Sequence, residues 1–299
     1  MSDSNAQNAT QLPVFDTLWN YRQPAETEKK FREIIPQAEI AGDVDYLAQL
    51  QTQIARTQGL QGKFDDAGST LDEVESLIHS NPILQKSVAK VRFFLERGRV
   101  HNSSGHPELA MPFFVQAFEL GKAIQANRYA IDAVHMIAIA EQDPQQQVEW
   151  NLQGIEMADA DPAQRGWLRA LYNNIGESYN SLQDYANAKL YFHKLIEFQI
   201  ASGQEPDIYT VKDEARATRL LGRPEESLAM VQPWAEKLKE QGEENGWISE
   251  ELAESLHALG RMGEAKPHFV KAYELLSADD YCQKYEQKKL KRLKEASLS

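Results

Sequence analysis

Cysteine is nearly absent from this sequence of 299 residues, in which Cys282 is the single example. One cysteine excludes an intramolecular disulfide and any metal site built from several thiolates. Such scarcity is typical of proteins from a reducing compartment. The first ten residues, MSDSNAQNAT, also lack the basic start and apolar core of a secretory signal. We therefore expect a cytoplasmic location.

Basic residues are too few to dominate the surface. The chain holds 32 Lys and Arg against 45 Asp and Glu, which gives a net charge of −13. A nucleic-acid-binding protein would need a dominant basic surface, so we expect no nucleic-acid partner. Long hydrophobic runs are missing too, because none approaches the roughly 18 apolar residues that a membrane span requires. Apolar residues still make up 42% of the chain, an ordinary value for a folded protein.

Catalytic and cofactor motifs are also missing. The sequence has no G-x-G-x-x-G, G-x-x-x-x-G-K-[ST], H-E-x-x-H, C-x-x-C or G-x-S-x-G. Glu254 and His257 have the spacing of di-iron bundle ligands, but no second good copy of that motif accompanies them. His101 and His106 flank a polar turn with serines, where nothing supplies an orienting acid or an oxyanion hole. The sequence predicts a non-enzymatic protein without metal or cofactor.

The clearest positive pattern lies in residues 169–203, which we interpret as two amphipathic helices. The link from Leu182 to Tyr185 is too short for anything except a tight return, so the helices are expected to be antiparallel. Gly176 and Ala188 are predicted to face each other where the backbones approach. One such hairpin cannot bury its second apolar face alone. Apolar positions recur three and four residues apart in both halves: Tyr172, Ile175, Gly176 and Tyr179, then Ala188, Phe192 and Leu195.

The same pattern recurs along the chain at intervals of 37 to 43 residues. This periodicity predicts about seven helix hairpins within residues 11–278. Four copies have glycine in the turn, where the end of a helix needs a left-handed residue: Gly62, Gly105, Gly222 and Gly260. The copy at position 147 is weaker, and the first copy is a worn version. The small residue of the second helix marks each copy: Thr27, Ala67, Ala110, Gln147, Ala188, Ser227 and Ala265.

The pattern resembles the tetratricopeptide repeat, whose signature W/Y-x2-L/I-G-x2-Y-x8-A-x3-F-x2-A is most complete from Tyr172 to Leu195. The resemblance covers about residues 12–280. The period exceeds the about 34 residues usual for this family, as in kinesin-light-chain-like and bacterial peptide-sensor arrays. The resemblance implies an all-α fold, a right-handed superhelical α-solenoid of antiparallel helix hairpins. It also implies a concave groove, lined by the first helices, in which peptides lie.

The two ends of the chain differ from the repeats. Residues 1–10 are polar and are expected to be disordered. Residues 279–299 are predicted to form a capping helix that starts at Asp279 or Asp280 and covers the last repeat with Tyr281, Cys282, Tyr285 and Leu293. Its lysines would suit the negative end of the helix dipole. The alternative is a basic helix that docks an acidic partner.

A second stripe on each first helix, roughly 130° from the apolar one, is the predicted groove surface. Six cations on it favour a carboxylate-bearing ligand, because arginine binds carboxylates through two charge-assisted hydrogen bonds. Its asparagines can both donate to and accept from a peptide backbone. The alternative is a set of solvated helix faces with pairs inside each helix. The predicted peptide-binding residues are Arg56, Arg92, Arg99, Asn102, Asp132, Asn173, Asn174, Glu177, Asn180, Lys212, Arg216, Arg219, Trp247, Glu250 and His257.

From this sequence we predict a protein- or peptide-binding scaffold or adaptor. Its partner would be another protein or an extended peptide, and a homo-oligomer remains open. One alternative is a regulator that senses a peptide and changes its superhelical pitch, although no effector domain is visible. Another is an accessory subunit of an enzyme complex. The set of Lys, Asn and Arg with which some tetratricopeptide repeats hold a C-terminal carboxylate is not found at matching positions.

Overall fold

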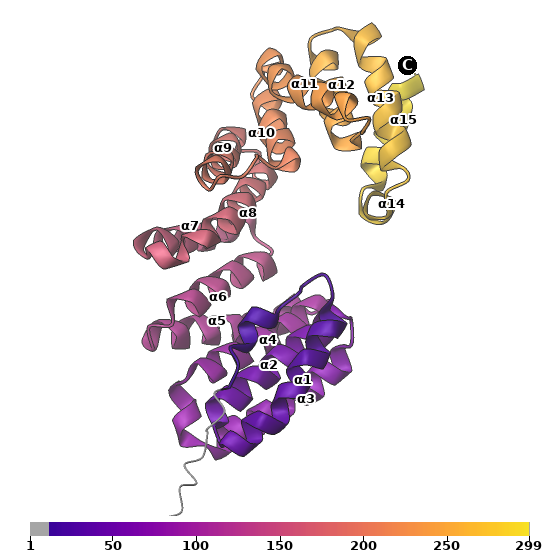
Figure 1. The fold of residues 1–299 in the computed structure, drawn as a ribbon. Coiled ribbons are helices and arrows are strands. Elements are labelled where there is room, and N and C mark those ends of the chain that lie inside the picture. Colours follow the sequence, from indigo (N-terminus) through magenta and orange to yellow (C-terminus); the bar gives the residue numbers. More distant parts are fainter. Residues whose placement is uncertain (1–11, 299) are drawn as a thin grey trace, which may run out of the picture. The chain divides into compact units, whose positions relative to one another are not determined.

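Every regular element of the described residues, 12–298, is a helix in the computed structural model (Figure 1). This confirms the predicted all-α class, whereas residues 1–10, predicted to be disordered, lie outside the described residues. The elements are η1 (Phe15–Leu18), α1 (Pro24–Ala41), α2 (Val44–Leu60), α3 (Phe64–Ser80), η2 (Pro82–Lys86), α4 (Val88–Ser103), α5 (Pro107–Ala123), α6 (Asn127–Ala140), α7 (Pro144–Ala160), η3 (Pro162–Trp167), α8 (Leu168–Ser181), α9 (Tyr185–Ala201), α10 (Ile208–Leu220), α11 (Pro224–Glu240), α12 (Gly246–Ala258), α13 (Met262–Leu276), α14 (Asp280–Tyr285) and α15 (Gln287–Leu298).

The helices begin and end where local side chains satisfy the free backbone groups. Proline opens four of the α-helices, because the N–H that it lacks would have no helical partner there. Asp184 caps α9 by accepting from the Asn187 backbone N–H at 3.1 Å. The four turn glycines, Gly62, Gly105, Gly222 and Gly260, all have φ between 72° and 90°, as predicted. In the α8–α9 turn Gln183 takes this place, with a φ of 59°.

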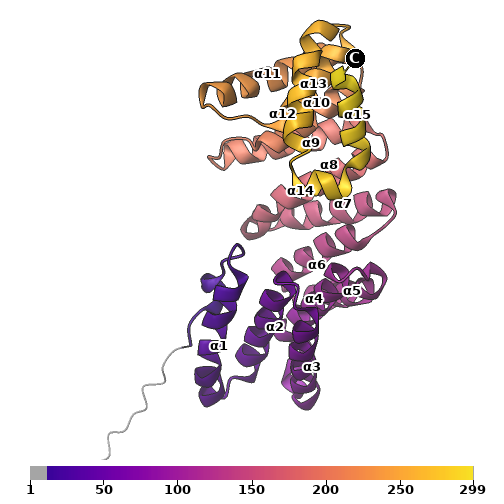
Figure 2. The same ribbon diagram turned by 90° about the vertical axis from the view of Figure 1, so that its right-hand side faces the viewer.

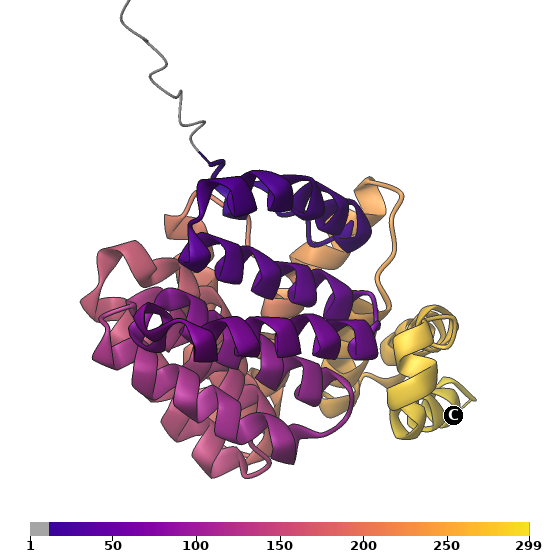
Figure 3. The ribbon, with the colours of Figure 1, turned by 90° about the horizontal axis from the view of Figure 1, so that it is seen from below.

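The chain divides into two compact units (Figure 2). The first unit comprises Met1–Gln146 and Glu156–Gln164, and the second comprises Gln147–Ile155 and Arg165–Ser299, so α7 contributes to both. The first unit holds the hairpins α2–α3 and α4–α5, and the second holds α8–α9, α10–α11 and α12–α13. In Figure 3 the helices of the first unit lie beside one another in layers.

The first predicted hairpin is incomplete. Its second helix is α1, but its first helix is only the four-residue turn η1. The reason is length, since Pro13 and Pro24 leave too few residues between them for a helix of hairpin size.

Each hairpin core is built on the small and aromatic positions of the repeat. The marker residues Thr27, Ala67, Ala110, Ala188, Ser227 and Ala265 are at most 1% exposed. In the weak copy Gln147 is only partly buried, whereas Val148 and Asn151 are buried. The atoms nearest to a Cβ at Gly176, which was predicted to face Ala188, belong to Phe192. The Phe192 Cε1 would lie 2.6 Å from such a Cβ. The glycine therefore makes room for the buried aromatic side chain.

The C-terminal segment forms two helices, α14 and α15, rather than the single helix predicted. Cys282, Leu290 and Leu293 enter a buried core with Leu276 of α13. Burial raises the pKa of the Cys282 thiol to about 11, which makes it unreactive near neutral pH. Tyr281 and Tyr285, which were expected to cover the last repeat, are 57% and 62% exposed instead.

None of the helices among residues 12–298 is long and apolar enough to cross a membrane.

Candidate functional site

The predicted stripe of the first unit is an internal network of ion pairs across α2, α4 and α6. Arg99 Nη1 lies 2.6 Å from Glu96 Oε1 on α4, and Arg99 also pairs with Asp132 on α6. Arg56 Nε on α2 lies 3.8 Å from the other oxygen of Glu96. Burial alone would lower the pKa of Arg99, but the Asp132 and Glu96 carboxylates raise it above its ordinary value. The predicted cations of this stripe therefore already have carboxylate partners within the unit.

Arg92 is committed to the N-terminal turn. Its Nη1 donates to Asp16 Oδ1 at 3.1 Å, and its Nε donates to the Tyr129 hydroxyl at 2.9 Å. The guanidinium also lies over the rings of Phe15 and Tyr129, 5.3 and 5.0 Å from their centroids. Only 4% of Arg92 is exposed. A ligand carboxylate would have to displace Asp16, so the predicted ligand role does not fit Arg92.

Asn102, the remaining predicted residue of α4, lies in its last turn and shapes the α4–α5 return. Its backbone carbonyl accepts from the Gly105 N–H at 3.1 Å.

The stripe of the second unit is different, because α8 and α10 leave a polar pocket between them. Its volume is about 440 Å³. The lining residues are Gly166, Arg169, Ala170, Asn173 and Asn174 from η3 and α8, Leu195 from α9, and Asp207, Tyr209 and Thr210 at the start of α10. Asn173 and Tyr209 are exposed. Arg169 and Asp207 form a loose pair at 3.9 Å, with side chains 52% and 38% exposed.

One amide group in this pocket is unsatisfied. The Nδ2 atom of Asn174 is buried and donates no hydrogen bond to any described residue. A buried polar group without a partner costs about 1–3 kcal/mol. Farther along the same face of α8, Asn180 Oδ1 is likewise buried without a donor among the described residues. This face therefore offers amide groups that the fold itself does not use.

Glu177 lies between these asparagines on α8, opposite the charges of α10. Desolvation by neighbouring side chains and repulsion from Asp213 raise the pKa of Glu177, while Lys212 and Arg216 act in the opposite direction. Lys212 pairs with Asp213 beside it. Arg216 is exposed and forms no ion pair with a carboxylate of the described residues. Arg216 is thus the cation of this stripe that stays accessible to a ligand.

A second polar pocket, of about 320 Å³, lies where α10, α12 and α15 meet. Arg219 Nε and Nη2 bind Glu251 at 2.7 and 3.0 Å. From α15, Arg292 Nη2 donates to Glu250 Oε1 at 2.9 Å, and Lys289 Nζ lies 3.5 Å from Glu250 Oε2. The pocket is lined by Tyr185, Lys212, Arg216, Arg219, Leu220, Glu250, Glu251, Glu254, Lys289 and Arg292.

The C-terminal helix thus covers the stripe of α12. The Trp247 ring has Lys289 Nζ 4.0 Å and Lys212 Nζ 5.2 Å from its centroid. Sequence reasoning missed Lys289 and Arg292 as members of this site, because it related the basic run to the helix dipole or to an acidic partner. His257 lies elsewhere, with its ring against Phe269 of α13.

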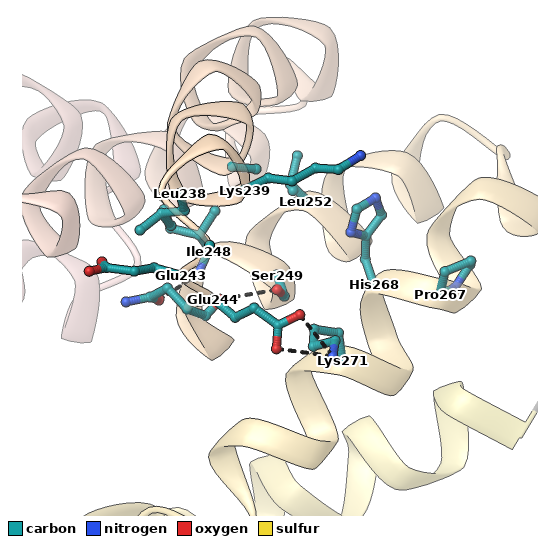
Figure 4. A pocket seen from close by; sticks show the side chains of 13 residues that line it. Leu238, Lys239, Glu243, Glu244, Ile248, Ser249, Leu252, Pro267, His268 and Lys271 are labelled. Atoms are coloured by element: carbon teal, nitrogen blue, oxygen red, sulfur yellow. Dashed lines mark hydrogen bonds and ion pairs between the residues drawn. The ribbon is translucent and has the colours of Figure 1, made fainter.

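Figure 4 shows a third pocket, of about 380 Å³, which sequence reasoning missed. Leu238 of α11 and Ile248 and Leu252 of α12 supply apolar surface, and His268 of α13 lies at the edge. Burial lowers the pKa of His268, so its ring is uncharged at neutral pH. Lys271 Nζ lies 3.0 Å from Glu244 Oε1. None of the predicted binding residues lines this pocket.

No group of three or more His, Cys, Asp or Glu side chains is placed to hold a metal ion within residues 12–298.

These observations define a helical-repeat array. Antiparallel hairpins recur at about 40 residues, each with a small residue or glycine packed against a buried aromatic or aliphatic side chain.

The comparisons with known proteins agree with that class. Residues 170–199 match the family model of the tetratricopeptide repeat, which confirms the resemblance inferred from Tyr172 to Leu195. No curated protein matches the sequence of the chain.

Several solved structures share the fold. One is a kinesin light chain candidate with nearly identical TPR-like repeats from Podosopora anserina (16% identity, 64% of this chain and 95% of that one, TM-score 0.53). Another is a STAND protein with a tetratricopeptide repeat sensor from Pyrococcus horikoshii (12% identity, 94% of this chain and 44% of that one, TM-score 0.66). The apo quorum sensor NprR from B. thuringiensis is a third (14% identity, 96% of this chain and 88% of that one, TM-score 0.52). At these identities the likeness shows the fold, and it includes the kinesin-light-chain-like and bacterial sensor arrays that the long period indicated.

Proposed function

We propose that this chain is a non-enzymatic scaffold that binds a protein or an extended peptide on α8 and α10 of its second unit. The observation that carries the proposal is Asn174, whose buried Nδ2 has no hydrogen-bond partner among the described residues. A turn of the Asn174 side chain that presented this amide to a ligand carbonyl would remove the cost of leaving it unsatisfied. Asn173, exposed beside it in the pocket of about 440 Å³, has both a donor and an acceptor to offer.

The pocket fits a peptide backbone better than a compact charged metabolite. It is lined by amide groups on α8 and by a carboxylate and two hydroxyls at the start of α10, which can donate to and accept from peptide groups. The one charge pair in it, Arg169 with Asp207, is loose at 3.9 Å and can open for a ligand. Backbone contacts of this kind give affinity with little sequence selection.

Arg216 adds a preference for acidic ligands. It is exposed and forms no ion pair with a carboxylate of the described residues, and Glu177 is a neighbouring carboxylate whose pKa it lowers. A carboxylate-bearing ligand side chain would therefore find its guanidinium accessible.

The test is a selection of random peptides of about 12 residues, displayed on phage, against the immobilised full-length protein. A selected peptide is then titrated calorimetrically. We expect N173A/N174A to weaken its binding at least about tenfold, as the loss of one or two hydrogen bonds predicts. R216Q should lower the share of Asp and Glu among the selected peptides.

Asn102→Ala is the matched control, because Asn102 has the same predicted role on α4 of the first unit. It should change the affinity less than about twofold. Circular dichroism should show all variants folded. Equal binding by wild type and N173A/N174A, or an equal loss in N102A, would place the ligand elsewhere.

A further inference from the structure

The C-terminal segment concentrates positive charge in an acidic protein. Residues 281–298 hold six Lys and Arg but only Glu286 and Glu295 as acids, whereas the whole chain has a net charge of −13. Two of the six, Lys289 and Arg292, bind Glu250 of α12 and belong to the pocket already described. The other four, which we call the lysine row, are Lys284, Lys288, Lys291 and Lys294.

The lysine row spans α14 and α15. Its members are four, three and three residues apart and are all exposed. Lys284 lies on α14, whereas Lys288, Lys291 and Lys294 lie on α15, beyond the break at Glu286. No carboxylate of the described residues forms an ion pair with any of the four. The row therefore gains nothing from internal pairing.

These four lysines do not stabilise the folded helices. Like charges three or four residues apart destabilise a helix by a few tenths of a kcal/mol per pair. The helix dipole does not explain them either, since the last turn of α15 contains no basic residue. Lys288 instead follows directly after Gln287, the first residue of α15, where a positive charge is unfavourable. The predicted dipole role is therefore wrong, and the capping contacts come from Leu290 and Leu293.

Two exposed aromatic side chains adjoin the row. The rings of Tyr281 and Tyr285 lie 5.1 Å apart between centroids, and they are 57% and 62% exposed. Lys284 Nζ lies 5.1 Å from the centroid of Tyr285. Exposed tyrosines bring apolar contact area and a hydroxyl, and they often contribute strongly to binding at protein interfaces.

We propose that the lysine row and this tyrosine pair form a docking surface for an acidic segment of a partner protein. The row of lysines supplies long-range attraction to carboxylates, and the tyrosines supply contact area at one end. This surface is independent of the one proposed on α8 and α10, so either can fail without the other.

An acidic peptide fits better than nucleic acid or a membrane. The row has lysine only, without the planar guanidinium forks that favour phosphate groups, and the rest of the chain would repel a polyanion of nucleic-acid length. Insertion into a lipid surface needs an apolar face, but Leu290 and Leu293 of α15 are buried in the core with α13.

The experiment uses the full-length chain and a fluorescein-labelled peptide of about eight alternating Glu and Ser residues. That length exceeds the roughly 9 Å from Lys288 to Lys294 along α15. Fluorescence anisotropy at about 50 mM salt should show saturable binding, and a peptide with Gln in place of Glu should not bind. The variant K284E/K288E/K291E/K294E should weaken binding at least about tenfold.

The matched control is K29E/K30E/K63E/K122E, which makes the same change in net charge with four exposed lysines of the first unit. It should weaken binding less than about threefold. If the reversal variant does not fold, the four Lys→Gln changes replace it, with an expected loss of at least about fivefold.

Three results would overturn the proposal. The first is that the wild type does not bind the Glu-Ser peptide. The second is an equal loss of affinity in the control variant. The third is tighter binding to a single-stranded oligonucleotide, or to phosphatidylserine vesicles, than to the peptide.

Discussion

The first helices of the two units carry polar stripes at the same place in the repeat, yet the two stripes differ in how their charges are paired. In the first unit Arg56, Glu96, Arg99 and Asp132 pair with one another from helix to helix. In the second unit Asn174 keeps a buried amide without a partner among the described residues, and Arg216 stays exposed. A charged stripe can therefore serve the fold itself. An exposed cation without an ion pair is a better sign of a ligand than charge alone.

Removing Arg99 should produce the largest effect, because it tests whether the first stripe holds the fold together. Arg99→Met leaves the carboxylates of Glu96 and Asp132, with side chains 5% and 15% exposed, without their main partner. Breaking a buried ion pair from one side costs about 3 kcal/mol or more. We expect urea unfolding to show a loss of about 3 kcal/mol in the free energy of unfolding.

Arg216→Met in the second unit is the counterpart and should change that free energy by less than about 0.5 kcal/mol. Similar losses in the two variants would remove the distinction between the stripes.

A smaller effect is expected where the units are alike, at the glycine that packs on an aromatic ring. A Cβ at Gly98 would lie 2.4 Å from Phe114 Cε1, and one at Gly176 would lie 2.6 Å from Phe192 Cε1. Both rings are fully buried. Gly98→Ala and Gly176→Ala should each lower the free energy of unfolding by about 2 kcal/mol, since overpacking outweighs the better helix propensity of alanine.

Gly68→Ala in α3 serves as the control, because nothing lies within 4 Å of a Cβ at that position. It should raise the free energy of unfolding by about 0.5–1 kcal/mol. Thermal unfolding should show lower midpoints for Gly98→Ala and Gly176→Ala and a higher midpoint for Gly68→Ala. A neutral Gly176→Ala would show that the second unit packs more loosely than the first.

The smallest effect concerns the turns. Glycine at positive φ follows α2 and α4 in the first unit and α10 and α12 in the second, whereas Gln183 adopts a φ of 59° after α8. Gln183→Gly should raise the free energy of unfolding by about 0.5 kcal/mol, because the left-handed strain exceeds the added entropy of the unfolded chain.

Gln241→Gly, at a φ of −81° after α11, should lower the free energy of unfolding by a similar amount. Differential scanning calorimetry of the two variants measures both shifts. A loss in Gln183→Gly would mean that the glutamine side chain contributes to the turn.

Most of the fold could be predicted because each hairpin is encoded locally. Marker positions such as Ala67, Ala110 and Ala265 are fully buried, and the turn glycines have the expected positive φ. The helix at α1 has no full partner because too few residues separate Pro13 from Pro24. The break between α14 and α15 at Glu286 could not be predicted, because the spacing of the apolar residues does not change there.

Less of the candidate site could be predicted, because side-chain pairing depends on contacts distant in sequence. A helical projection places Arg92 on the groove stripe but cannot reveal that the Arg92 guanidinium is already bound by Asp16. The projection correctly places Trp247 and Glu250 on the same stripe. It cannot reveal that Lys289 of α15 contacts both side chains. Glu96, three residues before Arg99, was the available signal for a paired stripe.

The contact between Arg92 and Asp16 has a consequence for the order of folding. It joins residues 76 apart in sequence, whereas the pairs Arg99–Asp132 and Arg219–Glu251 join residues 33 and 32 apart. Contacts between neighbouring repeats close short loops and can form early. The N-terminal turn can dock only after α4 has found its neighbours, so η1 should gain protection from hydrogen exchange after the helices that it covers.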